Sequence, residues 1–331
     1  MNIGPITIDS PIFSAPMAGY TNYAYREILR YFGGVGLIAT EMVSARSFVE
    51  LEKRGEDHPN RLWGVKDEPR PLAVQIWDND PATLTEFGRR LAFEYGVSVI
   101  DLNFGCPAKQ IAGRSASGSY LLKTPEKVGE IVEKVAIACS PIPVTAKIRL
   151  GWTRETINAT EIARIVEQAG AAAIYVHGRT ASQMYSGDAD WDEIAKIKSC
   201  LKNIPLIGNG DIKTAGEAIQ KLKNYPVDGI MIGRGGLNRP WLFRQIKQKL
   251  NGETADPEPT LLEQQSILKM HYRFVLERFG QPLAVILMRK YACDYALGKP
   301  GARKFRSLIS QVQNDEEFLR TVNEHFPVNS E

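Results

Sequence analysis

The sequence predicts an α/β chain, in which a (β/α)8 TIM barrel is followed by a small all-helical C-terminal domain. Eight short apolar runs alternate with helical patterns between residues 13 and 235, and after residue 250 only helical periodicity remains. The chain has 331 residues, of which 44% are hydrophobic and 24% charged. That composition is typical of a globular protein with a sizeable core, and it excludes a disordered or fibrous chain.

The eight apolar runs are predicted to be buried parallel strands. Most of them are apolar on both faces and then end in glycine or a polar side chain, as strands covered on both sides do. The predicted strands are 13–17, 37–42, 72–77, 98–104, 144–150, 173–178, 205–210 and 228–235.

Six helices are predicted between the strands, from apolar residues spaced three and four positions apart. They cover 21–32, 81–95, 125–138, 156–169, 190–199 and 214–223. Asp80 and Thr124 each precede a proline, which is the order of an N-cap residue and a first helical position. A doubly wound open sheet is the alternative architecture, but no G-x-G-x-x-G follows an early strand.

Polar residues stand near the ends of seven predicted strands. They are Glu41, Gln75, Asn103, Lys147, His177, Asn209 and Arg234. The carboxyl ends of all strands of a (β/α)8 barrel meet at one mouth, where the active sites of such enzymes lie. We therefore expect these side chains to surround one site.

The segment LNGETADPEPT (250–260) is predicted to be a linker, because it is polar and contains glycine and two prolines. It separates a predicted barrel domain at 1–249 from a predicted helical domain at 261–331. The helices expected in the second domain are 261–279, 282–297, 301–313 and 315–325.

The predicted helical domain has a local excess of positive charge, although the whole chain has a formal net charge of only +3. Residues 269–306 contain nine basic and two acidic side chains, a local net charge of +7. Aromatic residues lie between the basic ones: Tyr272, Phe274, Tyr291, Tyr295 and Phe305. This mixture suits a phosphate backbone and unstacked bases. The alternative is a solvated helical face above core aromatics.

Two glycine-containing segments, GNGD (208–211) and IGRG (232–235), follow the last two predicted strands. In barrels these loops often bind phosphate through backbone N–H groups. Arg234 can add a bidentate contact. The alternative is that the glycines only turn the chain.

Lys147 lies inside an otherwise apolar strand, where a cation is costly unless it is paired or reaches a ligand. We expect it to face a flavin; its alternative partners are Asp101 and Glu41. Gln75 and Asn103 can bind the edge of a heterocycle through paired donor and acceptor atoms. His177 is either a ligand of the same site or a structural residue.

Cys106 follows the fourth predicted strand, between Gly105 and Pro107. A free thiol is mostly protonated at neutral pH, which suits a proton donor better than a nucleophile. The glycine- and serine-rich stretch after it carries Lys109 and Arg114, and we expect a mobile lid that contacts phosphates. The four cysteines form no C-x-x-C, so we expect no metal site and a reducing, cytoplasmic compartment.

Seven motifs, in order, resemble those of the tRNA-dihydrouridine synthases. They are SAPMAGYTN (14–22), VQIW (74–77), NFGCP (103–107), AKIRLGW (146–152), VHGRT (176–180), GNGD (208–211) and IGRGG (232–236). APMAGYTN and MRKYACDYALGKPGARKFR (288–306) are most similar to the bacterial B-type branch. The resemblance covers nearly the whole chain.

The resemblance implies an FMN enzyme that reduces uridine in the D-loop of tRNA to 5,6-dihydrouridine, with NADPH or NADH as reductant. Hydride would reach C6 from the reduced flavin, and Cys106 would protonate C5. The flavin would be held by Pro16, Met17, Ala18, Gln75, Lys147, His177, Asn209, Gly210, Asp211, Gly233 and Arg234. Contacts with tRNA are expected from Asn103, Arg179, Lys109, Arg114, Arg289, Lys290 and Arg303.

Two other functions remain open on the residues alone. An FMN barrel oxidoreductase acting on a free pyrimidine explains the strand ends but not the basic helices, whereas a non-catalytic RNA-binding barrel leaves Cys106 and Lys147 idle. We expect tRNA as the partner, no signal peptide, no membrane span and a monomer. The sequence does not say which uridine is reduced, or whether NADPH or NADH is preferred.

Overall fold

The computed structural model describes residues 1–55, 62 and 64–326, so the last five residues of the predicted helical domain lie outside the described residues. Two compact units make up the chain. The first contains Met1–Thr21 and Val35–Gly233, and the second contains Asn22–Gly34 and Arg234–Glu331.

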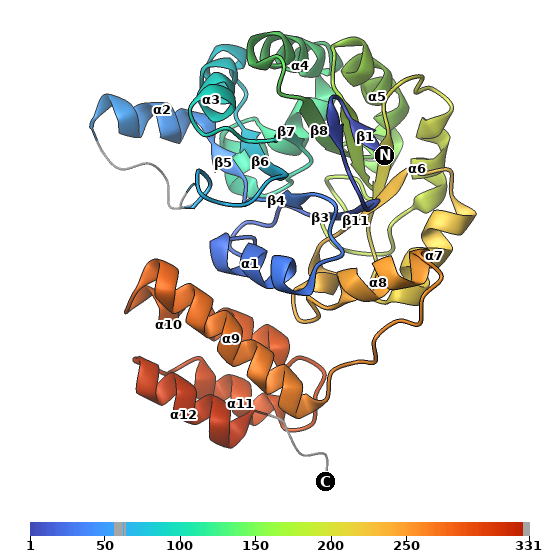
Figure 1. The fold of residues 1–331 in the computed structure, drawn as a ribbon. Coiled ribbons are helices and arrows are strands. Elements are labelled where there is room, and N and C mark those ends of the chain that lie inside the picture. Colours follow the sequence, from blue (N-terminus) through green and yellow to red (C-terminus); the bar gives the residue numbers. More distant parts are fainter. Residues whose placement is uncertain (56–61, 63, 327–331) are drawn as a thin grey trace. The chain divides into compact units, whose positions relative to one another are not determined.

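Eight parallel strands in the first unit form the barrel (Figure 1). They are β3 (Ile12–Ser14), β4 (Ile38–Ala39), β6 (Leu72–Trp77), β7 (Val99–Phe104), β8 (Val144–Arg149), β9 (Ala173–His177), β10 (Leu206–Asn209) and β11 (Gly229–Ile232). Each strand pairs with its sequence neighbour, and β11 pairs with β3. A parallel bridge between Phe13 and Leu37 joins β3 to β4 and completes the ring. The predicted TIM barrel is confirmed.

Helices α3 (Pro81–Phe93), α4 (Pro125–Cys139), α5 (Ala159–Gln168), α6 (Trp191–Lys198) and α7 (Ala215–Asn224) connect the strands, at the predicted places. Asp80 caps α3, because its carboxylate accepts a hydrogen bond from the backbone N–H of Thr83 at 2.9 Å. Thr124 precedes α4 but makes no such side-chain bond. The proline at the first turn is therefore the only part of the expected start signal that acts there.

Several short elements were not expected. They are a hairpin of β1 (Asn2–Ile3) and β2 (Ile6–Thr7), strand β5 (Val43–Ser44), helix α2 (Ala45–Lys53) and helix α8 (Leu242–Leu250). The two strands of the hairpin have two residues each, too few to show a period. The hairpin nevertheless matters for the core, since Ile3 joins Ile8, Phe13, Tyr175 and other buried residues in one apolar cluster. The barrel interior is thus a packed core and not a pore.

The second unit is helical. It contains α1 (Tyr23–Phe32), α8, α9 (Leu261–Phe279), α10 (Leu283–Tyr295), α11 (Ala302–Ile309) and α12 (Asp315–His325). Thr260 and Glu263 form a reciprocal capping box at the start of α9, and Gly280, with φ +64°, ends it. The predicted linker begins one residue too early, because Leu250 is the last residue of α8; residues 251–260 have no regular structure. Trp241 Nε1 donates to Glu258 at 2.8 Å and ties this segment to the residues before α8. The boundaries predicted for a catalytic and an RNA-binding domain stay a prediction.

Most aromatic residues among the basic helices belong to the core of this unit. Tyr272, Tyr291, Tyr295 and Phe305 are all buried, with exposed fractions between 0% and 2%. Stacking of bases on these four rings, expected from their spacing among lysines and arginines, is therefore wrong. The alternative of core aromatics beneath a charged surface holds, because helical spacing places both kinds of residue on one short segment but on different faces.

His271 makes the stability of the helical unit depend on pH. Burial disfavours its charged form and lowers its pKa from 6.5 to about 3, and Nε2 has no hydrogen-bond partner among the described residues. The unfolded chain therefore binds a proton below pH 6.5 that the folded chain does not bind until about pH 3. As the pH is lowered through this window, His271 should reduce the free energy of unfolding by about 1.4 kcal/mol per pH unit.

Denaturant unfolding of the wild type and His271→Phe between pH 7 and pH 4 measures this contribution. We expect the variant to lose less stability on acidification than the wild type does. His325→Phe is the control, because His325 is only partly buried at the end of α12. Equal slopes in the wild type and in His271→Phe would contradict the prediction.

Candidate active site

The strand ends bring five of the predicted residues to one rim of the barrel. Gln75, Asn103, Lys147, His177 and Asn209 come from β6 to β10, one from each strand. The register sets Asn103 beside Lys147, and His177 beside Asn209, on neighbouring strands. The predicted mouth is thus assembled by residues that lie up to 134 positions apart in the chain.

A directed chain of hydrogen bonds runs from the barrel interior to Cys106. Asp101 accepts from Thr145 Oγ1 at 2.8 Å and from Gln75 Nε2 at 2.7 Å. Gln75 Oε1 accepts from Asn103 Nδ2 at 2.9 Å, and Asn103 Oδ1 accepts from the backbone N–H of Cys106 at 2.9 Å. Every donor points toward the Asp101 end. An ionised carboxylate can only accept hydrogen bonds, so ionised Asp101 fixes which way the amides of Gln75 and Asn103 face.

Lys147 is part-buried, and its ammonium donates to Asn209 Oδ1 at 3.3 Å. No carboxylate forms an ion pair with Lys147 in the described part of the chain, so neither Asp101 nor Glu41 is the direct partner considered from the sequence. Burial and the nearby Arg149 lower the pKa of Lys147, while Asp101 raises it. Burial raises the pKa of Asp101 in turn. The two groups therefore share one buried electrostatic environment without touching.

Hydrogen bonds to both its backbone N–H and its backbone carbonyl fix the position of Cys106. Its N–H donates to Asn103, and its carbonyl accepts from the backbone N–H and the hydroxyl of Ser119, both at 3.0 Å. Burial raises the pKa of its thiol above the ordinary value of 9.0, against the opposing effects of the Ala108 N–H, Arg149 and Lys147. The thiol therefore carries its proton at neutral pH, as expected for a proton donor.

The residues after Cys106 are more ordered than the predicted lid. They form a π-helix, η2 (Lys109–Arg114), and a 3-10 helix, η3 (Gly118–Lys123), with Ile111, Leu121 and Leu122 buried. Gly118 has φ +57°, and a Cβ there would lie 2.7 Å from the carbonyl oxygen of Cys106. Glycine is required at this position, so the segment is fitted against the cysteine.

Arg149 connects three parts of the mouth, and sequence reasoning gave it no role in the site. Its side chain is buried and donates to the carbonyl oxygens of Gly105 at 2.9 Å, Thr180 at 2.9 Å and Met184 at 2.7 Å. The sequence feature that could have indicated a buried role for Arg149 is its place as the second basic residue in the strand segment AKIRLGW. Its partners are backbone atoms, which no motif reveals.

Arg179 is also buried, and it holds Asp211 and His177. Its guanidinium donates to both carboxylate oxygens of Asp211, at 2.8 and 3.0 Å, and lies 3.3 Å from His177 Nε2. Because a guanidinium only donates, neutral His177 accepts at Nε2 and carries its proton on Nδ1. Asp211 adopts φ +51°, and this contact helps to hold the left-handed backbone there. Contact of Arg179 with tRNA stays a prediction.

The remaining residues predicted for the flavin come from the loops after β3, β10 and β11. Pro16, Met17 and Ala18 follow β3, and a Cβ on Gly233 would lie 3.4 Å from Met17 Sδ. A Cβ on Gly210 would meet Ala189 at 2.4 Å and the His177 ring at 3.3 Å. Both glycines thus allow a close approach that a side chain would block. Arg234 is exposed in the 3-10 helix η5 (Arg234–Gly236) and belongs to the second unit.

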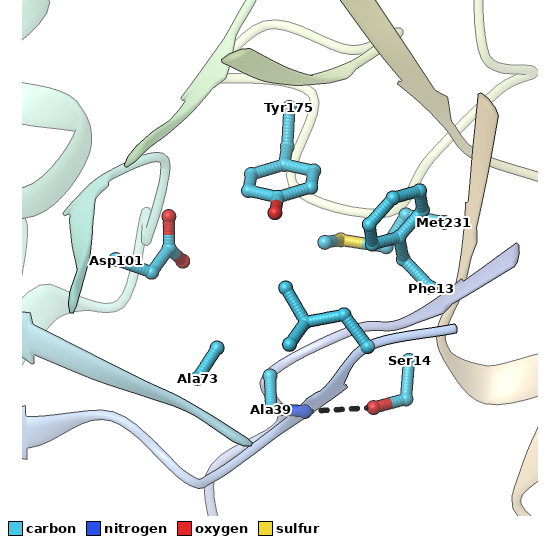
Figure 2. A pocket seen from close by; sticks show the side chains of 8 residues that line it. Phe13, Ser14, Ala39, Ala73, Asp101, Tyr175 and Met231 are labelled. Carbon is cyan, nitrogen blue, oxygen red and sulfur yellow. Dashed lines mark hydrogen bonds between the residues drawn. The ribbon is translucent and has the colours of Figure 1, made fainter. Parts of the chain in front are cut away.

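A small internal cavity lies inside the barrel. It is about 10 Å³ in volume and is lined by Phe13, Ser14, Leu37, Ala39, Ala73, Asp101, Tyr175 and Met231. Figure 2 shows Asp101 and Tyr175 facing it from the strands. Such a volume holds about one water molecule and no cofactor. A cofactor bound by the barrel must therefore lie outside this cavity.

A family model described as dihydrouridine synthase matches residues 13–331. The chain belongs to the dihydrouridine synthase family. A Pseudomonas aeruginosa protein named tRNA-dihydrouridine synthase B is 37% identical over 326 residues, 98% of this chain and 96% of that protein. A Rickettsia conorii protein named probable tRNA-dihydrouridine synthase is 37% identical over 315 residues, 95% of this chain and 92% of that protein.

A solved structure of morphinone reductase resembles this chain with a TM-score of 0.52 at 14% identity, covering 78% of this chain and 90% of that one. At this identity the likeness shows the barrel fold alone. The predicted family, and with it the predicted enzyme class, is confirmed by the family model and the relatives.

The basic residues predicted to contact tRNA lie in both units. Lys109 and Arg114 are exposed on η2, and Arg303 is exposed on α11. Arg289 donates from Nε to the carbonyl oxygen of Val312 at 2.8 Å, so part of its guanidinium is used within the helical unit. Lys290 lies 5.5 Å from the centre of the Tyr291 ring.

No described helix is long and apolar enough to cross a membrane. No group of three or more His, Cys, Asp or Glu among the described residues is placed to hold a metal ion.

Proposed function

We propose that this protein reduces uridine in the D-loop of tRNA to 5,6-dihydrouridine, with FMN as cofactor and NADPH or NADH as reductant. One observation carries the proposal: the backbone of Cys106 is held at the barrel mouth by Asn103, whose strand neighbour is the part-buried Lys147, in a member of the dihydrouridine synthase family. The relatives from Pseudomonas aeruginosa and Rickettsia conorii are named for this activity toward tRNA.

The residues at the mouth fit a flavin. The ammonium of Lys147 has one hydrogen bond, to Asn209, and can donate two more. Gln75 uses one N–H on Asp101 and one oxygen lone pair on Asn103, and these bonds orient its second N–H and second lone pair. Gly233 has no side chain between its backbone and a ligand, whereas Gly210 is needed for the close packing of Ala189. We propose that Gln75, Lys147 and His177 hold the ring system along Pro16, Met17 and Ala18, and that Asn209, Gly210, Gly233 and Arg234 hold the ribityl phosphate.

Asp211 serves this site differently from the contact that the family resemblance implies. Its carboxylate is occupied by Arg179 and by the backbone N–H of Ala189 at 2.7 Å. We propose that its contribution to phosphate binding comes from the backbone, since an ionised carboxylate has no proton to donate to an anion.

When bound, FMN would supply the chemistry of hydride transfer, here to C6 of the uracil. Cys106 supplies the proton to C5, so that the C5–C6 double bond becomes single, and the thiolate left behind recovers a proton from water. The side chain of Asn103 accepts a hydrogen bond from the backbone N–H of Cys106. Asn103 also lies beside Lys147 on the neighbouring strand, and we propose that it positions the base. The raised pKa of the thiol keeps the donor protonated at neutral pH.

The target uridine must leave its stack to reach this mouth, which costs roughly a few kcal/mol that contacts with the RNA must offset. We propose that Lys109 and Arg114 on η2 and the exposed cations of the helical unit, with Lys290 and Arg303 among them, make these contacts. With tRNA as substrate, we also propose a cytoplasmic monomer.

The test is reduction of tRNA by the purified, flavin-loaded protein. We expect NADPH to drive loss of uridine and formation of dihydrouridine in tRNA from a strain that lacks this modification, and tRNA affinity to fall steeply with salt. A flavin-loaded protein that reduces a free pyrimidine but leaves tRNA unchanged would replace this function by the small-molecule oxidoreductase.

A further inference from the structure

Two aromatic rings, one exposed and one half-buried, form a cluster with a lysine, and one of the rings directly follows the serine that holds Cys106. Tyr120 and Trp152 meet edge to face, with ring centres 5.8 Å apart. The ammonium of Lys123 lies 3.8 Å from the centre of the Trp152 ring and 4.7 Å from that of Tyr120. Tyr120 keeps 37% of its surface exposed. We call Tyr120, Lys123 and Trp152 the aromatic platform.

The platform is built from the segments that follow β7 and β8, two of the strands that carry active-site residues. Tyr120 follows Ser119, whose backbone and hydroxyl hold the carbonyl of Cys106. Trp152 comes three residues after Arg149 at the end of β8. The carbonyl of Trp152 accepts from the N–H of Ser182 at 2.9 Å, and the carbonyl of Gly151 accepts from Ala181 at 2.9 Å. Both ring-bearing segments are therefore anchored before any ligand arrives.

The segment that carries Tyr120 and Lys123 is basic, although the exposed Glu126 and Glu155 lie three residues after Lys123 and Trp152. Residues 102–125 contain Lys109, Arg114 and Lys123 and no acidic residue. Lys123 has no ion pair among the described residues, so its charge is balanced only by the two rings and solvent. Exposed aromatic rings with unpaired cations are the combination that binds unstacked nucleotides, where rings take the bases and cations take the phosphates.

We propose that the aromatic platform of Tyr120, Lys123 and Trp152 stacks a nucleotide that flanks the target uridine, with Lys123 on its phosphate. This rests on the proposed function. When the target base leaves its stack, its neighbours lose a stacking partner, and a ring beside Cys106 replaces it. The platform thereby holds the opened RNA strand in place while the target base is at the thiol. The four buried aromatics of the helical unit cannot do this, since none of them is exposed.

The contribution of ring stacking and that of the lysine charge to tRNA binding can be distinguished by their dependence on salt concentration. The dissociation constant for labelled tRNA is measured between 50 and 300 mM salt for the wild type, Tyr120→Ala, Tyr120→Phe and Lys123→Gln. Tyr120→Ala should weaken binding about tenfold at every salt concentration, a stacking loss of about 1.4 kcal/mol. Tyr120→Phe should bind as the wild type does. Lys123→Gln should lower the slope of log affinity against log salt by about 0.7, the value for one phosphate contact of a single strand.

Phe93 provides the matched control. It is 58% exposed at the end of α3, where the chain turns into the amino end of β7, so it lies on the rim opposite the strand carboxyl ends. Phe93→Ala should leave tRNA binding unchanged. Flavin content and thermal unfolding of each variant verify that Tyr120→Ala keeps the fold, and Tyr120→Phe preserves the packing of the ring.

Three outcomes would overturn the platform. One is tRNA affinity of Tyr120→Ala within twofold of the wild type. Another is an equal loss in Phe93→Ala. A third is a raised KM for NADPH with unchanged tRNA affinity, which would assign the rings to the reductant. If the wild type itself neither binds nor reduces tRNA, the proposed function fails instead, so the two failures are distinguishable.

Discussion

Cys106→Ala is expected to lower the rate of dihydrouridine formation by about 10²–10⁴-fold, the usual contribution of a positioned general acid. Flavin content, reduction of the flavin by NADPH and tRNA affinity should stay as in the wild type. The reason lies in the contacts: the backbone N–H and carbonyl of Cys106 bind Asn103 and Ser119, and these bonds do not need the thiol. Single-turnover reduction of tRNA by the pre-reduced enzyme measures the step directly.

The pH dependence supplies a second readout for the thiol. Burial raises the pKa of Cys106 above 9.0, so the donor loses its proton only above that pH. The rate of the single turnover should fall in this alkaline range for the wild type, and Cys106→Ala should show no such fall. Cys200→Ala is the control, because Cys200 also has a raised pKa but donates to backbone carbonyls of Thr160 and Ile197, away from β7. Undiminished product from Cys106→Ala would remove the cysteine from the chemistry.

The sequence predicted the barrel because each strand and helix carries its own period. The eight apolar runs and the six connecting helices appear at the expected places, and the strand ends gather Gln75, Asn103 and Lys147 at one rim. These predictions depend only on which residues lie at which end of a strand. The topology of the barrel then supplies the convergence.

Contacts between distant segments were beyond such reasoning. Arg149 serves the mouth through three backbone carbonyls, and Arg179 is buried against Asp211, yet both look like exposed basic residues in the sequence. The glycine-rich stretch after Cys106 was predicted as a mobile lid, but Gly118 and Ser119 fit it against the cysteine. In each case composition suggested mobility or exposure, whereas a specific partner far along the chain decided the structure.

Lys147→Met is expected to weaken flavin binding by about 10–100-fold, since a hydrogen bond from a charged donor contributes about 1.5–3 kcal/mol. The purified variant should be nearly colourless and regain flavin only at high FMN concentration. Folding should survive, because methionine fills the space of the lysine stem without a buried charge. Flavin titration by fluorescence measures the loss, and Lys134→Met, an exposed lysine on α4, is the control.

The same substitution tests the buried charge itself. Burial lowers the pKa of Lys147 from 10.5 to about 8, so between these values the unfolded chain binds a proton that the folded chain does not. The free energy of unfolding of the flavin-free protein should therefore rise with pH across this window, and Lys147→Met should lack that rise. In Lys147→Met the pKa of Asp101, which burial already raises, should rise further, because the charge of Lys147 that lowers it is gone. A flavin-loaded Lys147→Met with wild-type affinity would mean that the lysine is held at the mouth for the charge balance of Asp101 and not for the cofactor.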